Sequence, residues 1–493
     1  VIPKETAFGR KRMIDQNNCN KDYSCVNGFC PSFVTIEGGE RVKRAGSADA
    51  TRLAEALKGI ENPDTGIHDD CYDLLVTGVG GTGVITVGQL VTMAAHLEGK
   101  GASVLDFMGF AQKFGTVLSY IRIADMPAGI NQVRIEQARA DALIGCDLVV
   151  SSSPKASLTY SHGRTRALVN SAEMATGDFI LHRDADLRAD ARLGAIGKAV
   201  GEGNLAAINA NALAEKLLGN TIYANVLLLG AAWQQGLVPV SHAALMRAIE
   251  LNGVDIEKNK QAFGWGRVAV VDSGKLPVHG NESGRDDSEE TLNEFINRRA
   301  EFLVDYQDQA LADRYLALVD RVRETKNDDL IKAVARNYFR LLSYKDEYEV
   351  ARLHTQTGFL EKIREDYGPD ARLRFHLAPP LLSFSKDARG RPYKKEFGGW
   401  MIPVFRLLAG MRRLRGTWLD PFARSEDRRL ERELIADFEE LVDKILPLQS
   451  DESVAAALEL VGAFDEIRGY GPVKEEAAID ARAKIASHAI MRA

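Results

Sequence analysis

A run of glycines between an apolar strand and an apolar helix places the strongest constraint on the fold of this chain. Asp73–Thr77 have the character of a strand buried on both faces, and Val84–Glu98 have helical periodicity. The segment between them, GVGGTG, contains four glycines, at Gly78, Gly80, Gly81 and Gly83. Glycines permit a tight turn, and the free N–H groups at the start of the following helix attract phosphate. The turn predicts an α/β domain in which the glycines either bind a nucleotide-type ligand or only let helix and sheet pack closely.

Further strands and helices extend this pattern along the chain. Four more strands are predicted, at Ser103–Phe107, Val117–Ile123, Asp147–Val150 and Leu205–Ile208. Apolar strands that alternate with helices favour a doubly wound, Rossmann-like parallel sheet with right-handed crossovers. The apolar helix Ala224–Gln235 is expected to pack on this sheet. Asp106, near the end of the second strand, stands where a ribose-binding carboxylate would follow the glycine turn.

The chain is predicted to have three parts. Residues 1–64 carry a cysteine cluster, a short strand at Phe33–Ile36 and a linker. Residues 65–275 form the α/β domain, and residues 285–493 are mostly helical. Apolar residues at helical spacing predict helices in the last part at Leu311–Val322, Asp328–Leu342, Ser425–Leu446 and Glu475–Met491. A loop-rich stretch between Leu373 and Trp400 interrupts them.

Charge and hydropathy exclude several classes of protein. The formal net charge is −6, without the clustered basic excess that nucleic-acid or membrane-surface binding requires. No apolar run reaches the roughly 18–20 residues of a membrane span. The charged segment Val1–Arg12 lacks the apolar centre of a signal peptide. We therefore expect a cytoplasmic protein without nucleic-acid or membrane partners, and Val1 in place of methionine indicates a fragment or a processed product.

Three of the five cysteines are clustered near the N-terminus. The cluster reads CNKDYSCVNGFCP, from Cys19 to Pro31, and is similar to the bacterial ferredoxin run Cys-x2-Cys-x2-Cys-x3-Cys-Pro. Asp22 stands in place of the second cysteine, and the last gap is one residue longer. Short spacings let several thiolates reach one cluster without strain. Cys19, Asp22, Cys25 and Cys30 are therefore candidate ligands of a metal site.

Several interpretations of this segment remain open. Either Asp22 is an oxygen ligand to a fourth, more exchangeable iron, or the fourth ligand is a cysteine from a missing upstream part. Cys30 has the position whose counterpart in two-cluster ferredoxins serves the other cluster. A zinc site with three cysteines, or three free surface thiols, are the alternatives to an iron–sulfur cluster.

Two stretches of the predicted α/β domain resemble the gamma domain of 2-oxoacid:ferredoxin oxidoreductases. One is the glycine turn with its helix, Val76–Gln89. The other is Met108–Ile123, which keeps a glycine, a serine and an arginine of the family pattern at Gly115, Ser119 and Arg122. Lys113-Phe114 stand where the family commonly has Arg-Gly, so no role is assigned to Lys113. The resemblance implies that Gln112, Gly115 and Arg122 contact a cofactor, in addition to the glycines of the turn.

The flanking segments resemble a long, fused form of this family, the indolepyruvate:ferredoxin oxidoreductases. Lys11–Gly39 is similar to the junction that follows their thiamine-diphosphate domain. The C-terminal part resembles their extra helical domain, most recognisably at Tyr344–Glu349, Leu373–Ser383 and Glu466–Lys474. The resemblance covers nearly the whole chain in the family's domain order. It favours an iron–sulfur cluster, of the [4Fe–4S] type, at the cysteine segment.

The resemblance implies a reaction and a division of labour. Indolepyruvate or a related aryl or branched 2-oxoacid is decarboxylated on thiamine diphosphate and released as an acyl-coenzyme A, while electrons pass through iron–sulfur clusters to ferredoxin. This chain has no Gly-Asp-Gly followed by the asparagine that holds magnesium diphosphate. We therefore expect thiamine diphosphate and magnesium on a missing part or partner subunit, no activity of this chain alone, and a homo-oligomeric enzyme. The gamma domain either contacts coenzyme A or serves as a scaffold.

Two other hypotheses compete with this one. The first is a stand-alone nucleotide- or coenzyme-A-binding regulatory protein, and the second is an NAD-dependent dehydrogenase, for which no catalytic pair can be named. The nine histidines show no ligand spacing, and Cys71 and Cys146 are interpreted as buried thiols. The basic cluster Arg389–Lys395 is interpreted as solvated surface or as a docking patch for acidic ferredoxin.

Overall fold

The computed structural model separates the chain into two compact units. It describes residues 2–4, 6–14, 16, 19, 21–39, 42, 50–67, 70–81, 83–109, 115–174, 186–277, 290–378, 387, 393–447 and 451–488. The first unit comprises residues 1–19 and 43–285, and the second comprises residues 20–42 and 286–493. The segment 1–64, predicted to be a part of its own, is thus divided, and most of its cysteine cluster belongs to the C-terminal unit.

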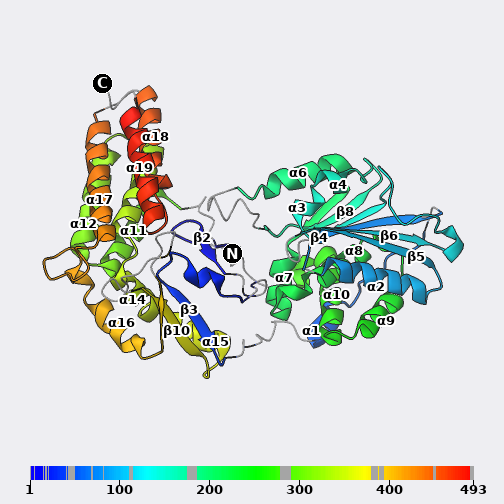
Figure 1. The fold of residues 1–493 in the computed structure, drawn as a ribbon. Helices are drawn as coiled ribbons and strands as arrows, with labels where there is room; N and C mark the ends of the chain where they lie inside the picture. Colours follow the sequence, from blue (N-terminus) through cyan, green and yellow to red (C-terminus); the bar gives the residue numbers. More distant parts are fainter. Residues whose placement is uncertain are drawn as a thin grey trace. The chain divides into compact units, whose positions relative to one another are not determined.

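A six-stranded sheet forms the centre of the first unit (Figure 1). Its order is β5-β6-β4-β7-β8-β9, and β4, β7, β8 and β9 are parallel neighbours. β6 is antiparallel to both β4 and β5. The bounds are β4 Tyr72–Val79, β5 Gly101–Met108, β6 Thr116–Ala124, β7 Ala142–Gly145, β8 Arg166–Asn170 and β9 Leu205–Ile208. The predicted α/β class is confirmed, with one antiparallel strand inserted beside β4.

Helices cover both faces of this sheet, as Figure 1 shows. One face packs against α2 (Val84–Leu97), α8 (Ala224–Gln234) and α10 (Ile256–Val271), and the other against α3 (Leu148–Ser151) and α6 (Ala189–Val200). The remaining elements of the unit are β1 Ile2–Lys4, β2 Lys11–Met13, α1 Ala50–Ala56, η2 Pro127–Gly129, α4 Pro154–Ser157, α7 Ala210–Leu218, η3 Thr221–Tyr223, α9 His242–Asn252 and η4 Ser273–Lys275. The predicted helix at Ala224–Gln235 is therefore present and packs on the sheet.

One predicted strand is wrong. Asp147 caps the short helix α3, which begins at Leu148, and the strand at this point is β7, five residues earlier. The carboxylate of Asp147 accepts a hydrogen bond from the backbone N–H of Val150 and so caps the helix. A short apolar run has no periodicity that distinguishes strand from helix, and the capping interaction decided the outcome.

The second unit is a helical bundle with a small sheet. Its helices are α11 Leu292–Tyr306, α12 Gln309–Arg323, α13 Asp328–Leu342, α14 Glu347–Thr355, α15 Phe359–Tyr367, α16 Met401–Gly410, α17 Glu426–Ile445, α18 Asp451–Glu466 and α19 Pro472–Ser487, with η1 Ser24–Asn27 and η5 Arg412–Leu414. Stacked and edge-on rings of Tyr315, Tyr338, Phe438 and Phe464 run through the bundle. The four predicted helices are thus present, with ends that shift by a few residues.

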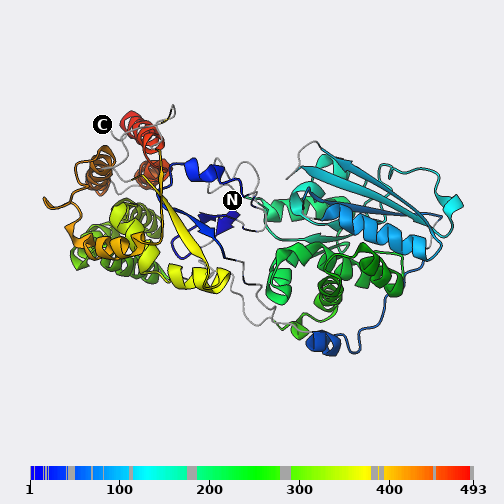
Figure 2. The ribbon, with the colours of Figure 1, turned by 60° about the horizontal axis from the view of Figure 1, so that its bottom comes forward.

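Three strands in the second unit come from distant parts of the sequence. β3 (Phe33–Glu37), β10 (Arg372–Leu377) and β11 (Lys395–Phe397) form an antiparallel sheet in the order β11-β10-β3. β3 and β10 run side by side in both views (Figures 1 and 2). The predicted strand at Phe33–Ile36 is therefore present, and its partner lies in the stretch that was predicted to be rich in loops.

Candidate functional site

The glycine turn connects β4 to α2 at the carboxyl edge of the parallel strands. The backbone N–H of Gly80 donates to the carbonyl oxygen of Gly115 at 2.7 Å, which ties the turn to the start of β6. Gly81 and Gly83 have φ of 85° and 94°, so both occupy the left-handed region that favours glycine. α2 follows with no side-chain cap at Gly83. The structure thus brings the predicted glycines and Gly115 together.

Close packing explains two glycines of this motif and its helix. A Cβ on Gly78 would lie 2.5 Å from Val84 and 2.9 Å from the Cβ of Cys146. A Cβ on Gly88 in α2 would lie 2.7 Å from the hydroxyl oxygen of Ser119. These glycines let α2 and the end of β7 approach the sheet closely, so part of the motif serves packing.

A buried carboxylate lies against the glycine turn. Asp147 is 2% exposed, and its Oδ2 is 3.3 Å from the position of a Cβ on Gly78. Burial raises the pKa of Asp147, while backbone hydrogen bonds from Val150, Val79 and Val149 oppose that rise. A carboxyl group at this edge of the sheet disfavours a phosphate in the same place. The arrangement supports a packing role for the turn more than a phosphate site beneath it.

Two residues predicted to contact a ligand lie elsewhere. Arg122 is opposite Asp73 at the other end of β4 from the glycine turn, and its Nε donates to Oδ1 of Asp73 at 2.7 Å. The two side chains are 9% and 6% exposed, so this ion pair is buried. Asp106 accepts a hydrogen bond from the hydroxyl of Ser119 at 2.6 Å, and β6 separates its strand from β4. The predicted ribose contact of Asp106 does not fit, because a whole strand intervenes, and Gln112 lies outside the described residues.

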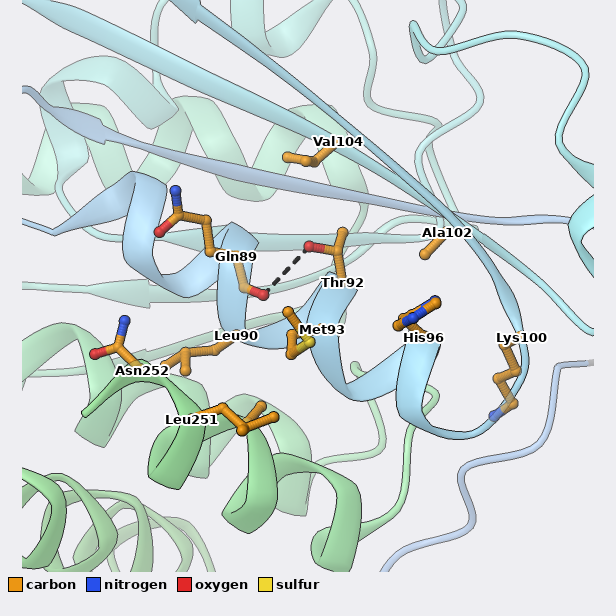
Figure 3. Close-up of a pocket in the computed structure, with 11 residues that line it drawn as sticks. Gln89, Leu90, Thr92, Met93, His96, Lys100, Ala102, Val104, Leu251 and Asn252 are labelled. Atoms are coloured by element: carbon orange, nitrogen blue, oxygen red, sulfur yellow. Dashed lines mark hydrogen bonds between the residues drawn. The ribbon is translucent and has the colours of Figure 1, made fainter. Parts of the chain in front are cut away.

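One recess of the first unit lies beside α2 (Figure 3). Its volume is about 540 Å³, and side chains from α2, β5 and α9 line it. Its walls include exposed apolar side chains, those of Met93, Val104 and Leu251. At one end lies Lys100, which forms an ion pair with Glu98 and donates to the carbonyl oxygen of Pro239. A second recess, of about 460 Å³, includes Phe107 on the opposite face of the same edge strand. Neither is at the glycine turn.

The cysteine segment forms a tight loop on the second unit. Asp22 accepts hydrogen bonds at Oδ1 from the backbone N–H and the hydroxyl of Ser24, and so stabilises the start of η1. Cys25 is exposed in η1, and Cys30 is partly exposed, with its sulfur 3.4 Å from the hydroxyl oxygen of Ser32. Cys19 is assigned to the first unit. Of the predicted ligands, Asp22, Cys25 and Cys30 therefore share one loop.

These thiols fit part of a metal centre. Within the described ranges, no group of three or more His, Cys, Asp or Glu side chains is positioned to hold a metal ion. Two accessible thiols on one short loop do suit a cluster whose other ligands come from elsewhere. The histidines are likewise not grouped, and Cys146 is buried as predicted, but Cys71 is partly exposed.

Two lysines beside this loop were not predicted as functional. Lys394 donates to the carbonyl oxygens of Val26 at 2.7 Å and Cys30 at 2.6 Å, and Lys345 donates to the hydroxyl of Ser32 at 2.5 Å. Burial lowers the pKa of Lys394, and the nearby sulfurs of Cys30 and Cys25 oppose this. Lys394 belongs to the basic cluster Arg389–Lys395, which was interpreted as solvated surface or as a docking patch for ferredoxin. Its contact with the cysteine segment had no signal in the sequence.

Comparison with known proteins assigns part of the chain to a family. Residues 73–269 match the family model described as pyruvate ferredoxin/flavodoxin oxidoreductase. Indolepyruvate oxidoreductase subunit IorB of Pyrococcus horikoshii is 28% identical over 207 residues, which are 40% of this chain and 94% of that protein. The subunit of the same name from Thermococcus kodakarensis is 26% identical over 202 residues, with 39% and 92% coverage. A solved gamma subunit of the keto/oxoacid ferredoxin oxidoreductase from Geobacter sulfurreducens is 24% identical, with 40% and 98% coverage and a TM-score of 0.29.

Residues 73–269 are therefore a domain of the 2-oxoacid:ferredoxin oxidoreductase family, which places the chain among oxidoreductase enzymes. Residues 292–487 match a second model, described as a family of unknown function (DUF6537). Across the part of the chain that the structure describes, no helix is long and apolar enough to cross a membrane.

Proposed function

We propose that this chain is a component of an indolepyruvate:ferredoxin oxidoreductase. The assembled enzyme decarboxylates indolepyruvate or a related aryl or branched 2-oxoacid, releases an acyl-coenzyme A, and passes electrons to ferredoxin in the cytoplasm. Thiamine diphosphate and magnesium are held outside this chain, on another part of the polypeptide or on a partner subunit. The observation that carries the proposal is the family domain at residues 73–269, which is similar over most of the length of two IorB subunits.

The first unit contributes a scaffold in this proposal. Its glycine turn is stabilised by Gly115 and packed over the buried carboxyl group of Asp147, and Arg122 is engaged in a buried ion pair. Any contact with coenzyme A is therefore expected at Gly81 and Gly83 and, as the family resemblance implies, at Gln112, and not at Arg122. The two recesses beside β5, which expose Val104 on one face and Phe107 on the other, are suited to packing against other parts of the enzyme.

The cysteine segment contributes to electron transfer. Cys25 and Cys30 would hold an iron–sulfur cluster together with further ligands, and the cluster would supply one-electron steps to ferredoxin. Cys25 is exposed and Cys30 is partly exposed, so an electron acceptor could approach a cluster that they hold. Asp22 already stabilises the backbone of the loop, so a cysteine from an upstream part is the more suitable fourth ligand.

Metal analysis tests this assignment directly. The chain is purified without oxygen, and iron, zinc and acid-labile sulfide are measured with visible spectra before and after dithionite. About four irons per chain with a spectrum that bleaches on reduction supports a cluster formed within the chain, and about three irons supports a cluster with an empty or labile fourth site. In the Cys25→Ser/Cys30→Ser variant the iron should be lost, whereas Cys71→Ser should keep it. A chain that contains zinc, or stays free of iron after reconstitution, contradicts a self-contained cluster.

The reaction needs the assembled enzyme. The complex is purified by a tag on this chain, and reduction of ferredoxin is measured with indolepyruvate, pyruvate or 2-oxoglutarate in the presence of coenzyme A. Reduction that depends on both indolepyruvate and coenzyme A supports the proposal. Absence of any 2-oxoacid-dependent reduction, together with tight nucleotide binding by the chain, would instead favour the stand-alone regulatory protein.

A further inference from the structure

We propose that the C-terminal unit, which includes the family of unknown function, has the role of holding the cysteine segment, and that Lys394 clamps its loop. Three C-terminal stretches stand out in the sequence, at Tyr344–Glu349, Leu373–Ser383 and Glu466–Lys474. In the structure, residues of all three contact the segment between Val26 and Glu37. The use of this loop as a cluster site rests on the proposed function, but the clamp itself does not.

The sheet provides the first attachment. β10 pairs with the whole of β3, from Arg372 opposite Glu37 to His376 opposite Phe33. The ring Nε2 of His376 is 2.9 Å from the hydroxyl oxygen of Thr35, and the ring of Phe375 is fully buried beneath the sheet. The cysteine segment therefore continues into a strand whose only neighbour in the sheet, among the described residues, comes from the C-terminal unit.

Lys394 provides the second attachment, at the loop itself. Its ammonium group donates to the carbonyl oxygens of Val26 and Cys30, the two ends of the loop between the thiols. The same group lies 4.7 Å from the ring centre of Phe33. Hydrogen bonds from a charged donor are stronger than neutral ones, and two of them on one nitrogen fix the distance between the two carbonyls. The loop is thereby closed by a side chain that is remote in sequence.

The third attachment comes from Lys345 and Gly471. Lys345 donates to the hydroxyl of Ser32, which in turn contacts the sulfur of Cys30. Gly471, with φ of 55°, lies beside the ring of Phe29, so that even an added Cβ would fit at an ordinary van der Waals distance of 3.6 Å. Lys345 and Gly471 thus lie against Ser32 and Phe29, which follow and precede Cys30 in the chain.

The segment needs this support because it has little core of its own. In η1 only Val26 is buried, and Cys25 remains exposed. A short loop with one buried apolar residue cannot offset the conformational entropy of its ordering. Contacts from the C-terminal unit supply the order while they leave the thiols accessible. This is the arrangement expected of a loop that must present its thiols in a fixed geometry.

The clamp is tested by hydrogen exchange on the chain without metal, with Lys394→Met against the matched control Lys395→Met. Lys395 is the neighbouring, exposed lysine at the start of β11. We expect the backbone amides of Val26 and Gly28, which close η1, to exchange at least about tenfold faster in Lys394→Met and at an unchanged rate in the control. Lys394→Arg, which keeps charged donors, should restore part of the protection.

The outcomes separate the clamp from the cluster. Equal exchange of Val26 and Gly28 in Lys394→Met and in Lys395→Met overturns the clamp. If the amides of β3 also lose protection in Lys394→Met, then exchange of the cysteine segment is measured in Lys345→Met. Unchanged exchange of the segment in Lys345→Met overturns the proposal that the C-terminal unit as a whole holds it. Iron content of the same variants is a separate readout. A wild-type chain without iron contradicts a cluster formed within this chain, while the exchange data still decide whether Lys394 orders the loop.

Discussion

Replacing Arg122 distinguishes a structural arginine from a ligand-binding one. The resemblance to the oxidoreductase family implies a cofactor contact, whereas the structure pairs Arg122 with Asp73 inside the sheet. Arg122→Met removes the guanidinium and leaves the carboxylate of Asp73 buried without its charged partner. The two hypotheses therefore predict losses of different properties, stability in one case and ligand affinity in the other.

The size of the stability loss follows from the burial of the pair. The side chains of Arg122 and Asp73 are only 9% and 6% exposed, so solvent cannot replace the lost partner. Removing one member of a buried ion pair costs about 3–5 kcal/mol. For a unit of this size, that corresponds to a melting temperature lower by about 6–20 °C. The double variant Arg122→Met/Asp73→Asn should recover part of the loss, because no uncompensated charge stays buried.

Calorimetry and urea unfolding measure the effect, with Arg139→Met as the control. Arg139 is exposed in the same unit, and its replacement should change stability by less than about 0.5 kcal/mol. Coenzyme A binding is measured on the same proteins by titration calorimetry. An Arg122→Met variant with wild-type stability but weaker coenzyme A binding would refute the structural assignment.

Two further predictions concern each unit separately. Gly266→Ala should destabilise the first unit by roughly 1–3 kcal/mol or more, because a Cβ at this position would collide with the carbonyl of Leu227, where α8 and α10 pack. Gly194→Ala is the control, because Gly194 faces open space on α6, and it should stabilise the unit by a few tenths to about 1 kcal/mol. Chemical unfolding measures the free energy of unfolding of both variants. In the second unit, burial lowers the pKa of His354 to about 4, below the ~6.5 of the unfolded chain. The unfolded state therefore binds more protons between these values, so the free energy of unfolding should fall as pH drops from ~6.5 to ~4, by up to about 3 kcal/mol. His354→Phe should flatten this dependence and His96→Gln should not, and an unchanged slope in His354→Phe would contradict the assignment.

The elements that could be predicted were those with a local signal. The strand, turn and helix around Gly78–Gly83 were correctly predicted, because apolar periodicity and glycine conformation act over a few neighbouring residues. Four helices of the C-terminal unit, α12, α13, α17 and α19, were predicted for the same reason. The strand predicted at Asp147–Val150 was wrong, since a run of four residues has no period that distinguishes a strand from a helix, and Asp147 caps a helix there.

The candidate site was less accessible to sequence reasoning. Asp106 was predicted to suit ribose recognition from the end of the second strand, but the antiparallel β6 lies between that strand and β4. Arg122 matches a family pattern, yet only the register of β6 against β4 places it opposite Asp73. Strand order and register depend on which apolar surfaces can be buried together, and no single segment contains that information.

The sequence alone determined the α/β class of the first unit, the helical character of the second and the positions of the clustered thiols, because each depends on residues close together in the chain. Tertiary structure alone decided what surrounds those thiols. Thr35 and His376 are 341 residues apart and meet across β3 and β10, and Lys394 reaches Val26 from 368 residues away. Such contacts form only when the unit folds as a whole, because the entropy of closing so long a loop is offset by the burial of many side chains at once.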